Sequence, residues 1–429
     1  MDYKGSARVL GIGAGPANLS LAALAEPIPE LSVTVLEARN SVSWHPGLLW
    51  TDSRLQVSGV KDLVTLADPR NRFSFLNFLH EHGRLYRHLI ANADHVSRLE
   101  FDQYFTWAAK MLDVHLAETV KEVDHDGQRF VVQTTAGTWI ADNLLLGIGQ
   151  APYIPDFARP FIGPHLWHAA HHLNHGRSLA DKDVLLVGGG QSGAEIAMDL
   201  VSGKAGLPRQ LTWVTGQRGF TPLDESPFSG EWFNPKFVEY FHEKSLTQRS
   251  MLLALQSPAD HGTSQQLLQR IYKRLYEIDY LTPHTFRHSL MSGVELADLS
   301  RLRNGFNCSL QDVVTSEKWD TTAEIVVLAT GFHRQLPCFM EPLRDRLPLA
   351  GDEYIVERDY RIAWDGPDTN RIYVQNAARS SHGVADPNLS LAAWRSAVII
   401  NSLLRREHYS LGRQDITLDL NRNEQPRLP

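Results

Sequence analysis

The sequence LLVGGGQSGAEIA spans residues Leu185–Ala197. It places an apolar strand before Gly188, Gly190 and Gly193, and a helix after them. Glycines at this spacing let a backbone approach a pyrophosphate, while the N-terminus of the following helix faces the negative charge. A similar stretch, VLGIGAGPANLSLAAL, occupies Val9–Leu24. One dinucleotide needs one such loop, so two loops predict two dinucleotide cofactors.

The first loop lies in a complete nucleotide-binding pattern. Residues 8–12 are expected to form a strand, 17–24 a helix, and 32–36 a second strand that ends at Glu37. An acid about 20 positions after such a loop is typical of the carboxylate that accepts ribose hydroxyls. Pro16 replaces the third glycine of the motif, but the context still predicts a nucleotide site. The residues expected to hold this cofactor are Gly11, Gly13, Gly15, Pro16, Asn18 and Glu37.

The second unit favours a different dinucleotide. Its second strand, QLTWVT, is followed by GQRG instead of an acid. A carboxylate there would repel a ribose phosphate, whereas Thr215 and Arg218 can bind one. NADPH is therefore preferred to NADH at this loop, with Gly188, Gly190 and Gly193 at its pyrophosphate. The first loop is then expected to hold FAD, so hydride can pass from nicotinamide to flavin.

Composition argues for small-molecule chemistry. The 429 residues are 43% hydrophobic, and the formal net charge of -7 gives no reason to expect a nucleic-acid or anionic-membrane partner. The apolar segment 7–25 is broken by glycine, proline and polar residues, so no membrane span is expected. Cys308 and Cys338 are too few for a disulfide framework, which favours the cytoplasm, and too far apart for a disulfide reductase.

The expected fold is α/β, with two Rossmann-like dinucleotide-binding domains and a small helical segment that caps the substrate. The FAD-binding domain is expected at 1–165 and 325–429, and the NADPH-binding domain at 166–223 and 283–324. Residues 224–282 show helical spacing and form the substrate segment. A homo-oligomer, dimer or tetramer, is expected.

Several motifs resemble those of the N-hydroxylating flavin monooxygenases, which include the lysine, ornithine and aliphatic-diamine hydroxylases of hydroxamate siderophore assembly. They extend over nearly the whole chain. The resemblance implies that NADPH and O₂ convert a terminal primary amine to a hydroxylamine. The motifs are SWHPGLL, LQVSGVKDLVTLADP, FSFLNFLHEHGRLY, RLEFDQYFTWAA, LVGGGQSGAE, LDESPF, ATGF and SHGVADPNLSLAAWRSA.

The resemblance also implies site residues. Trp44, His45 and Gln56 are expected near the flavin ring, and Gln191 and Ser192 at NADPH. Matching motifs add Thr330, Gly331, Asn388, Leu389 and Ser390 to the cofactor sites. Lys61 matches the lysine that meets the substrate carboxylate in the amino-acid hydroxylases, although it could also be a solvated loop lysine. Gln56 and Lys61 are the candidate catalytic residues, and Gln56, Lys61, Gly230 and Ser390 the candidate substrate contacts.

The substrate is left between lysine and cadaverine. Gly230 and Ala259 stand where the ornithine enzymes carry asparagines, which argues against ornithine and favours a diamine. Lys61 instead favours lysine, because its ammonium attracts a carboxylate and repels a second ammonium. Ornithine and putrescine stay open as alternatives.

Two other functions are weighed. FIGPHLWHAAHH, residues 161–172, nearly matches a Baeyer–Villiger fingerprint, which would indicate oxygenation of a carbonyl group or of sulfur, but His168 is one position late. A redox-sensing dinucleotide-binding protein is the non-enzymatic alternative. The histidines of this region fit no metal geometry and are expected in a polar surface loop, so no metal is predicted. These histidines are His165, His168, His171, His172 and His175.

Overall fold

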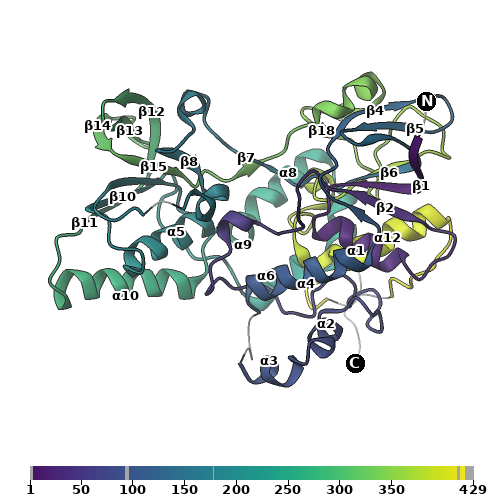
Figure 1. Ribbon diagram of the computed structural model, residues 1–429, viewed down its shortest axis with the longest axis horizontal. Helices are drawn as coiled ribbons and strands as arrows, with labels where there is room; N and C mark the ends of the chain where they lie inside the picture. Colours follow the sequence, from purple (N-terminus) through teal and green to yellow (C-terminus); the bar gives the residue numbers. More distant parts are fainter. Residues whose placement is uncertain (1–2, 92–95, 177, 413–415, 421–429) are drawn as a thin grey trace.

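The computed structural model describes residues 3–91, 96–176, 178–412 and 416–420. Two β-sheets lie side by side, the first on the right of Figure 1 and the second on the left. Among the described residues, no helix has the length and apolar character to cross a membrane.

The first sheet is built around the N-terminal strand. It has seven strands in the order β3-β2-β1-β6-β5-β4, with β19 paired to β6. Strands β2 and β6 run parallel to β1, so the predicted unit of strand, loop, helix and strand is confirmed. The strands are β1 (Tyr3–Ile12), β2 (Val33–Leu36), β3 (Val114–His115), β4 (Val120–His125), β5 (Phe130–Thr134), β6 (Gly137–Leu146) and β19 (Ile372–Val374).

Helices and a long irregular region cover this sheet. α1 follows the first glycine loop and packs beside α12 from the far end of the chain. Six fully buried aromatic side chains hold the irregular region between residues 44 and 79 against α4. They are Phe73, Phe75, Phe78, Phe101, Tyr104 and Phe105. The helices are α1 (Pro16–Ala25), η1 (Pro46–Leu48), α2 (Phe75–Glu81), α3 (Leu85–Ala91), α4 (Arg98–Met111) and α12 (Ala392–Leu404).

The second sheet has five parallel strands in the order β11-β10-β9-β15-β8. The chain was expected to return to the first domain at residue 325, but Ile325–Leu328 pairs with Asp183–Val187, so that boundary is wrong. Residues Ile325–Leu328 are all apolar, as expected for a strand that has a parallel neighbour on each side. The strands are β8 (Leu166–His168), β9 (Asp183–Val187), β10 (Gln210–Thr215), β11 (Arg287–Ser292) and β15 (Ile325–Leu328).

Smaller elements lie beside both sheets and link them. A three-stranded antiparallel sheet packs beside the second sheet, and the short pair of strands β7 and β16 lies between the two halves. These elements are β7 (Ala151–Pro152), η2 (Asp156–Phe161), η3 (Ala169–His171), η4 (Leu173–His175), α5 (Gln191–Ser202), β12 (Val294–Leu302), β13 (Gly305–Asp312), β14 (Lys318–Ala323), β16 (Phe332–His333), η6 (Cys338–Arg346), β17 (Leu349–Ala350) and β18 (Glu353–Tyr354).

The segment 224–282 is helical, as its pattern predicts. Asn234 caps α7, and Ser245 and Gln248 form a capping box at α8. Helices α7 and α8 contact α11 near the C-terminal end, so the segment touches both parts of the chain. Its helices, with two short ones that follow β19, are α6 (Pro227–Gly230), η5 (Glu231–Phe233), α7 (Pro235–His242), α8 (Leu246–Leu255), α9 (Ser257–Asp260), α10 (Gln265–Leu281), α11 (Arg379–His382) and η7 (Leu389–Leu391).

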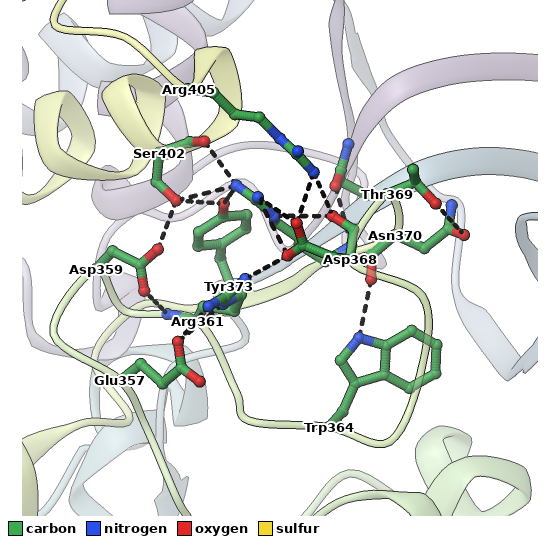
Figure 2. Close-up of polar contacts among 12 residues, drawn as sticks. Glu357, Asp359, Arg361, Trp364, Asp368, Thr369, Asn370, Tyr373, Ser402 and Arg405 are labelled. Atoms are coloured by element: carbon green, nitrogen blue, oxygen red, sulfur yellow. Dashed lines mark hydrogen bonds and ion pairs between the residues drawn. The ribbon is translucent and has the colours of Figure 1, made fainter.

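Polar contacts fasten α12 to the first sheet at two depths. Near the surface, Asp368 pairs with Arg361 and Arg405 at 2.8 Å each, as Figure 2 shows. In the interior, Arg395 is 1% exposed and pairs with the buried Asp386. Its guanidinium also donates to Gln375 Oε1 at 2.9 Å. Arg395 and Asp386 therefore compensate each other's charge in a place that solvent does not reach.

Removal of the inner guanidinium should destabilise the protein strongly. Arg395→Met leaves the Asp386 carboxylate buried, with Arg334 at 3.4 Å as its remaining cation. We expect a loss near the lower end of about 3–5 kcal/mol, measured by urea unfolding. The matched control, Arg405→Met, breaks an exposed pair and should cost less than about 1 kcal/mol. Equal losses in the two variants would contradict this account.

Candidate active site

The first glycine loop leaves the N-terminus of α1 open. Gly13 has φ +93°, and a Cβ there would lie 2.6 Å from the Gly147 carbonyl oxygen, so backbone geometry and space both require glycine. Gly15 differs, because a Cβ there would meet only that oxygen, at 3.9 Å. Gly15 is also the N-cap of α1, which receives no side-chain cap. Space and unpaired N–H groups at a helix N-terminus suit a phosphate.

Asn18 and Glu37 hold this loop. The Asn18 amide donates to the carbonyl oxygens of Ile12 and Gly13, at 3.2 and 2.9 Å, so its visible role is to brace the loop. The Glu37 carboxylate accepts from the Ala14 N–H at 2.9 Å and from Arg39 at 3.0 Å. Burial alone would raise the pKa of Glu37, but these hydrogen bonds outweigh it and lower the pKa. Glu37 is thus a buried, ionised acceptor beside the loop.

The second glycine loop repeats the arrangement at α5. Gly188 has φ +119°, and a Cβ there would lie 2.1 Å from the Ala329 carbonyl oxygen. A Cβ at Gly193 would lie 2.1 Å from the Gly188 carbonyl oxygen. Gly190, the N-cap of α5, has no atom within 4 Å of an added Cβ, and no side chain caps the helix. Close packing within the protein explains why Gly188 and Gly193 are glycines, whereas Gly190 faces open space.

The two residues expected at a ribose phosphate differ in access. Thr215 is 3% exposed, and its Oγ1 accepts from the Gln217 N–H at 3.3 Å. A Cβ at Gly189 would lie 2.7 Å from that oxygen, so Thr215 packs beneath the loop. Arg218 is exposed. Of the two, Arg218 is the side chain that an anion can reach.

A cavity of about 440 Å³ brings the predicted residues of both sheets together. Its walls come from the loop after η1, the start of α5, the helical segment and the loop before α12. The predicted residues that line it are Gln56, Lys61, Gly190, Gln191, Ser192, Gly230, Gly331, Asn388 and Ser390. Ala259 lines it as well. The predicted residues outside its lining are Gly11, Gly13, Gly15, Pro16, Asn18, Glu37, Trp44, His45, Gly188, Gly193, Thr215, Arg218, Thr330 and Leu389.

Lys61 lies on the cavity wall at the end of a braced turn. The neighbouring Asp62 is 1% exposed, and its carboxylate accepts from the N–H groups of Thr65 and Phe75 at 2.7 Å each. Burial raises the pKa of Asp62 despite these bonds. Burial also lowers the pKa of Lys61, because the partly desolvated wall disfavours its ammonium. This position differs from that of a fully solvated loop lysine.

The expected surface loop of histidines is wrong for two of its members. His168 and His172 are 2% and 8% exposed. His168 Nε2 lies 2.9 Å from the Gly331 carbonyl oxygen, and its Nδ1 accepts from the Ala170 N–H at 3.1 Å. Burial lowers the pKa of His168 to about 4, so the ring is neutral on the cavity wall. The described residues contain no group of three or more His, Cys, Asp or Glu arranged to hold a metal ion.

Trp44 and His45 lie next to each other, outside the lining of the cavity. The backbone N–H of Trp44 donates to the Asp102 carboxylate, and His45 has φ +55°. The His45 ring lies 6.0 Å from that of Phe332, which lines the cavity. Burial, with the charges of Arg98 and Arg39, lowers the pKa of His45 to about 4. The imidazole is therefore neutral at physiological pH.

Sequence reasoning missed several lining residues. Asp224 accepts from the Ser226 N–H and the Ser229 hydroxyl, and these bonds lower its pKa. Glu225 and Phe233 also line the cavity. Asp224 and Glu225 belong to the motif LDESPF, but the motif alone predicted no role for either residue. Phe233 belongs to a cluster of aromatic residues in the segment expected to cap the substrate, but the pattern did not indicate which of them would line the cavity.

Comparisons with known proteins agree over most of the chain. The L-lysine 6-monooxygenase/L-ornithine 5-monooxygenase family matches residues 6–334. The L-lysine N6-monooxygenase of Escherichia coli is 33% identical over 412 residues, which cover 95% of this chain and 97% of that protein.

Two solved structures are similar. DfoA bound to FAD, the cadaverine monooxygenase of desferrioxamine biosynthesis from Erwinia amylovora, is 31% identical with a TM-score of 0.90, over 98% of this chain and 99% of that chain. The Kutzneria ornithine N-hydroxylase with reduced FAD, NADP⁺ and L-ornithine is 27% identical with a TM-score of 0.86, over 93% and 99%.

These matches favour N-hydroxylation over the carbonyl-oxygenating and redox-sensing alternatives. The family match covers both glycine loops and the wall that carries Lys61. The chain therefore belongs to the L-lysine 6-monooxygenase/L-ornithine 5-monooxygenase family of N-hydroxylating enzymes.

Proposed function

We propose that the chain uses FAD, NADPH and O₂ to hydroxylate the terminal amine of a five-carbon diamine or diamino acid, cadaverine or L-lysine, for hydroxamate siderophore synthesis. The observation that carries this proposal is the single cavity that Gln56 and Lys61 line together with Gly190, the N-cap of α5. FAD would supply the redox chemistry with O₂ once NADPH has reduced it.

The chain's residues fit both cofactors. The open helix ends at Gly15 and Gly190 suit pyrophosphates, and the ionised Glu37 suits ribose hydroxyls. The cavity wall lowers the pKa of Lys61 by desolvation. The same environment would favour the neutral form of a substrate amine, which alone has a lone pair for the reaction. The protein then has to orient that nitrogen and exclude water.

Alanine at the two open glycines should separate the cofactors. An added methyl at Gly15 or Gly190 meets no close protein atom, so both variants should fold. Gly15→Ala should lower the FAD content, whereas Gly190→Ala should keep its flavin but reduce slowly with NADPH. Flavin absorbance and stopped-flow reduction measure the two effects. Gly163→Ala, at another open glycine, is the matched control; the opposite pattern would reverse the sites.

Arg218 should discriminate NADPH from NADH. Its exposed guanidinium can bind a ribose phosphate that NADH lacks. Arg218→Ala should raise the Michaelis constant for NADPH by roughly tenfold or more, because a charge-assisted hydrogen bond contributes about 1.5–3 kcal/mol. NADH oxidation should hardly change in the same assay. Equal losses with both nucleotides would refute the assignment.

The substrate choice rests on opposing features of the cavity. Lys61 attracts a carboxylate and therefore favours lysine. Gly230 and Ala259 supply no amide to hold an amino-acid head group, and a Cβ at Gly230 would meet nothing within 4 Å. This second observation favours cadaverine, because a buried carboxylate with few partners is costly.

Lys61→Ala should decide between lysine and cadaverine. For lysine, the variant should raise the Michaelis constant steeply with little change in turnover, the pattern of lost uniform binding. For cadaverine, it should be neutral or improve binding, because a like charge is removed. Hydroxylamine formation is measured with lysine, cadaverine, ornithine and putrescine. Efficient hydroxylation of ornithine or putrescine, with both five-carbon amines inert, would overturn the chain-length proposal.

A further inference from the structure

Two charged residues to which the proposed function gives no role, Arg98 and Glu195, meet in the structure. Arg98 is the first residue of α4, which packs on the core of the first sheet, and Glu195 lies on α5 beside the second sheet. Arg98 Nη2 donates to Glu195 Oε2 at 2.5 Å. The two side chains are only 14% and 8% exposed. A buried ion pair therefore joins the two halves of the molecule.

The contact continues from Glu195 to the cavity. Glu195 Oε1 accepts from Gln191 Nε2 at 2.8 Å, and Gln191 Oε1 accepts from the Ser264 N–H at 2.9 Å. Both ends of the Gln191 amide are thus occupied. Gln191 is the first residue of α5 and lines the cavity next to Gly190. Its side-chain position depends on the carboxylate that Arg98 holds.

Arg98 also contacts the segment that precedes Gln56. Its Nη2 donates to the Leu48 carbonyl oxygen at 3.1 Å, and its backbone N–H donates to the Ser53 carbonyl oxygen at 3.0 Å. These two residues lie in the segment that leads to Gln56, which lines the same cavity as Gln191. One guanidinium therefore contacts the segment that positions Gln56 and the carboxylate that positions Gln191.

A second ion pair at the same junction differs in burial. Arg270 on α10 contacts Asp52 at 2.7 Å, but the two side chains are 51% and 46% exposed. Solvent screens such a pair, and long side chains lose entropy when they form it. The buried pair is different, because removal of one partner leaves the other charge without solvent. The exposed pair provides a matched control on the same interface.

We propose that Arg98 and Glu195 are positioning residues that fix the α5 loop against the flavin side and hold Gln191 in place for the nicotinamide. This inference rests on the proposed NADPH site. The pair touches neither the cavity nor the reacting atoms directly. Its loss should therefore slow hydride transfer from NADPH without removing the flavin.

A double-mutant cycle tests the pair in the FAD-loaded protein. Arg98→Gln, Glu195→Gln and the double variant are compared by stopped-flow flavin reduction at saturating NADPH. Each single variant should reduce roughly tenfold more slowly, and the double variant no more slowly than the worse single, because coupled residues are not additive. Reduction by dithionite, which needs no nicotinamide site, should stay unchanged. Asp52→Asn should match the wild type.

Hydrogen exchange supplies a readout that does not depend on turnover. In the protein without nucleotide, peptides covering 188–195 and 48–56 should exchange faster in each single variant than in the wild type or in Asp52→Asn. Full-rate NADPH reduction in Glu195→Gln, or multiplied defects in the double variant, would overturn the proposal. If Glu195→Gln does not fold, Arg98→Lys, which keeps the charge but loses the planar fork, gives the same comparison.

The outcomes also separate this inference from the proposed function. A wild-type flavin that NADPH does not reduce, or a Gly190→Ala variant that reduces normally, would refute the NADPH assignment itself. Slow reduction in Gly190→Ala together with normal reduction in Glu195→Gln would leave that assignment intact and refute only the positioning role.

Discussion

In each glycine loop, the backbone approaches the end of a neighbouring strand so closely that a side chain would not fit. The carbonyl oxygen of Gly147, just after β6, blocks a side chain at Gly13, and that of Ala329, just after β15, blocks one at Gly188. Because these positions have no room for a side chain, each loop can pass close to the neighbouring strand end before α1 or α5 begins. The open N-termini at Gly15 and Gly190 follow from this constraint, and so does the space available for two phosphate groups.

The sequence predicts well what depends on neighbours along the chain. Strand, glycine loop and helix follow one another within some 20 residues at β1 and at β9, and the structure confirms both units. The errors concern contacts between distant segments. Ile325–Leu328 reads as a buried strand, but only its pairing with β9 places it in the second sheet. His168 reads as polar, yet Gly331 and Ala170 satisfy its ring inside the protein.

In the candidate site, too, the sequence predicted residue types better than contacts between distant segments. The cavity lining at Lys61, Gly190 and Ser390 was predicted from three motifs separated by more than a hundred residues each. Thr215 was expected at a phosphate, but it supports the loop from below. A residue type and its spacing indicate what a side chain can bind, whereas burial decides whether a ligand can reach it. Arg98 and Glu195 are the opposite case. Nothing in the sequence near either residue predicts their ion pair, which forms only because α4 and α5, from different halves of the molecule, meet.

The late position of β19 has a consequence for synthesis on the ribosome. The first sheet begins with the N-terminal strand, but β19 at Ile372–Val374 and the covering α12 come near the end of the chain. At about 5–20 residues per second, the nascent β6 edge waits for its partner on the order of tens of seconds. The second sheet has all of its strands by Leu328 and can form earlier. During that interval Leu144–Leu146 of β6 lack the strand that pairs with them in the folded protein, and slow translation would prolong their exposure.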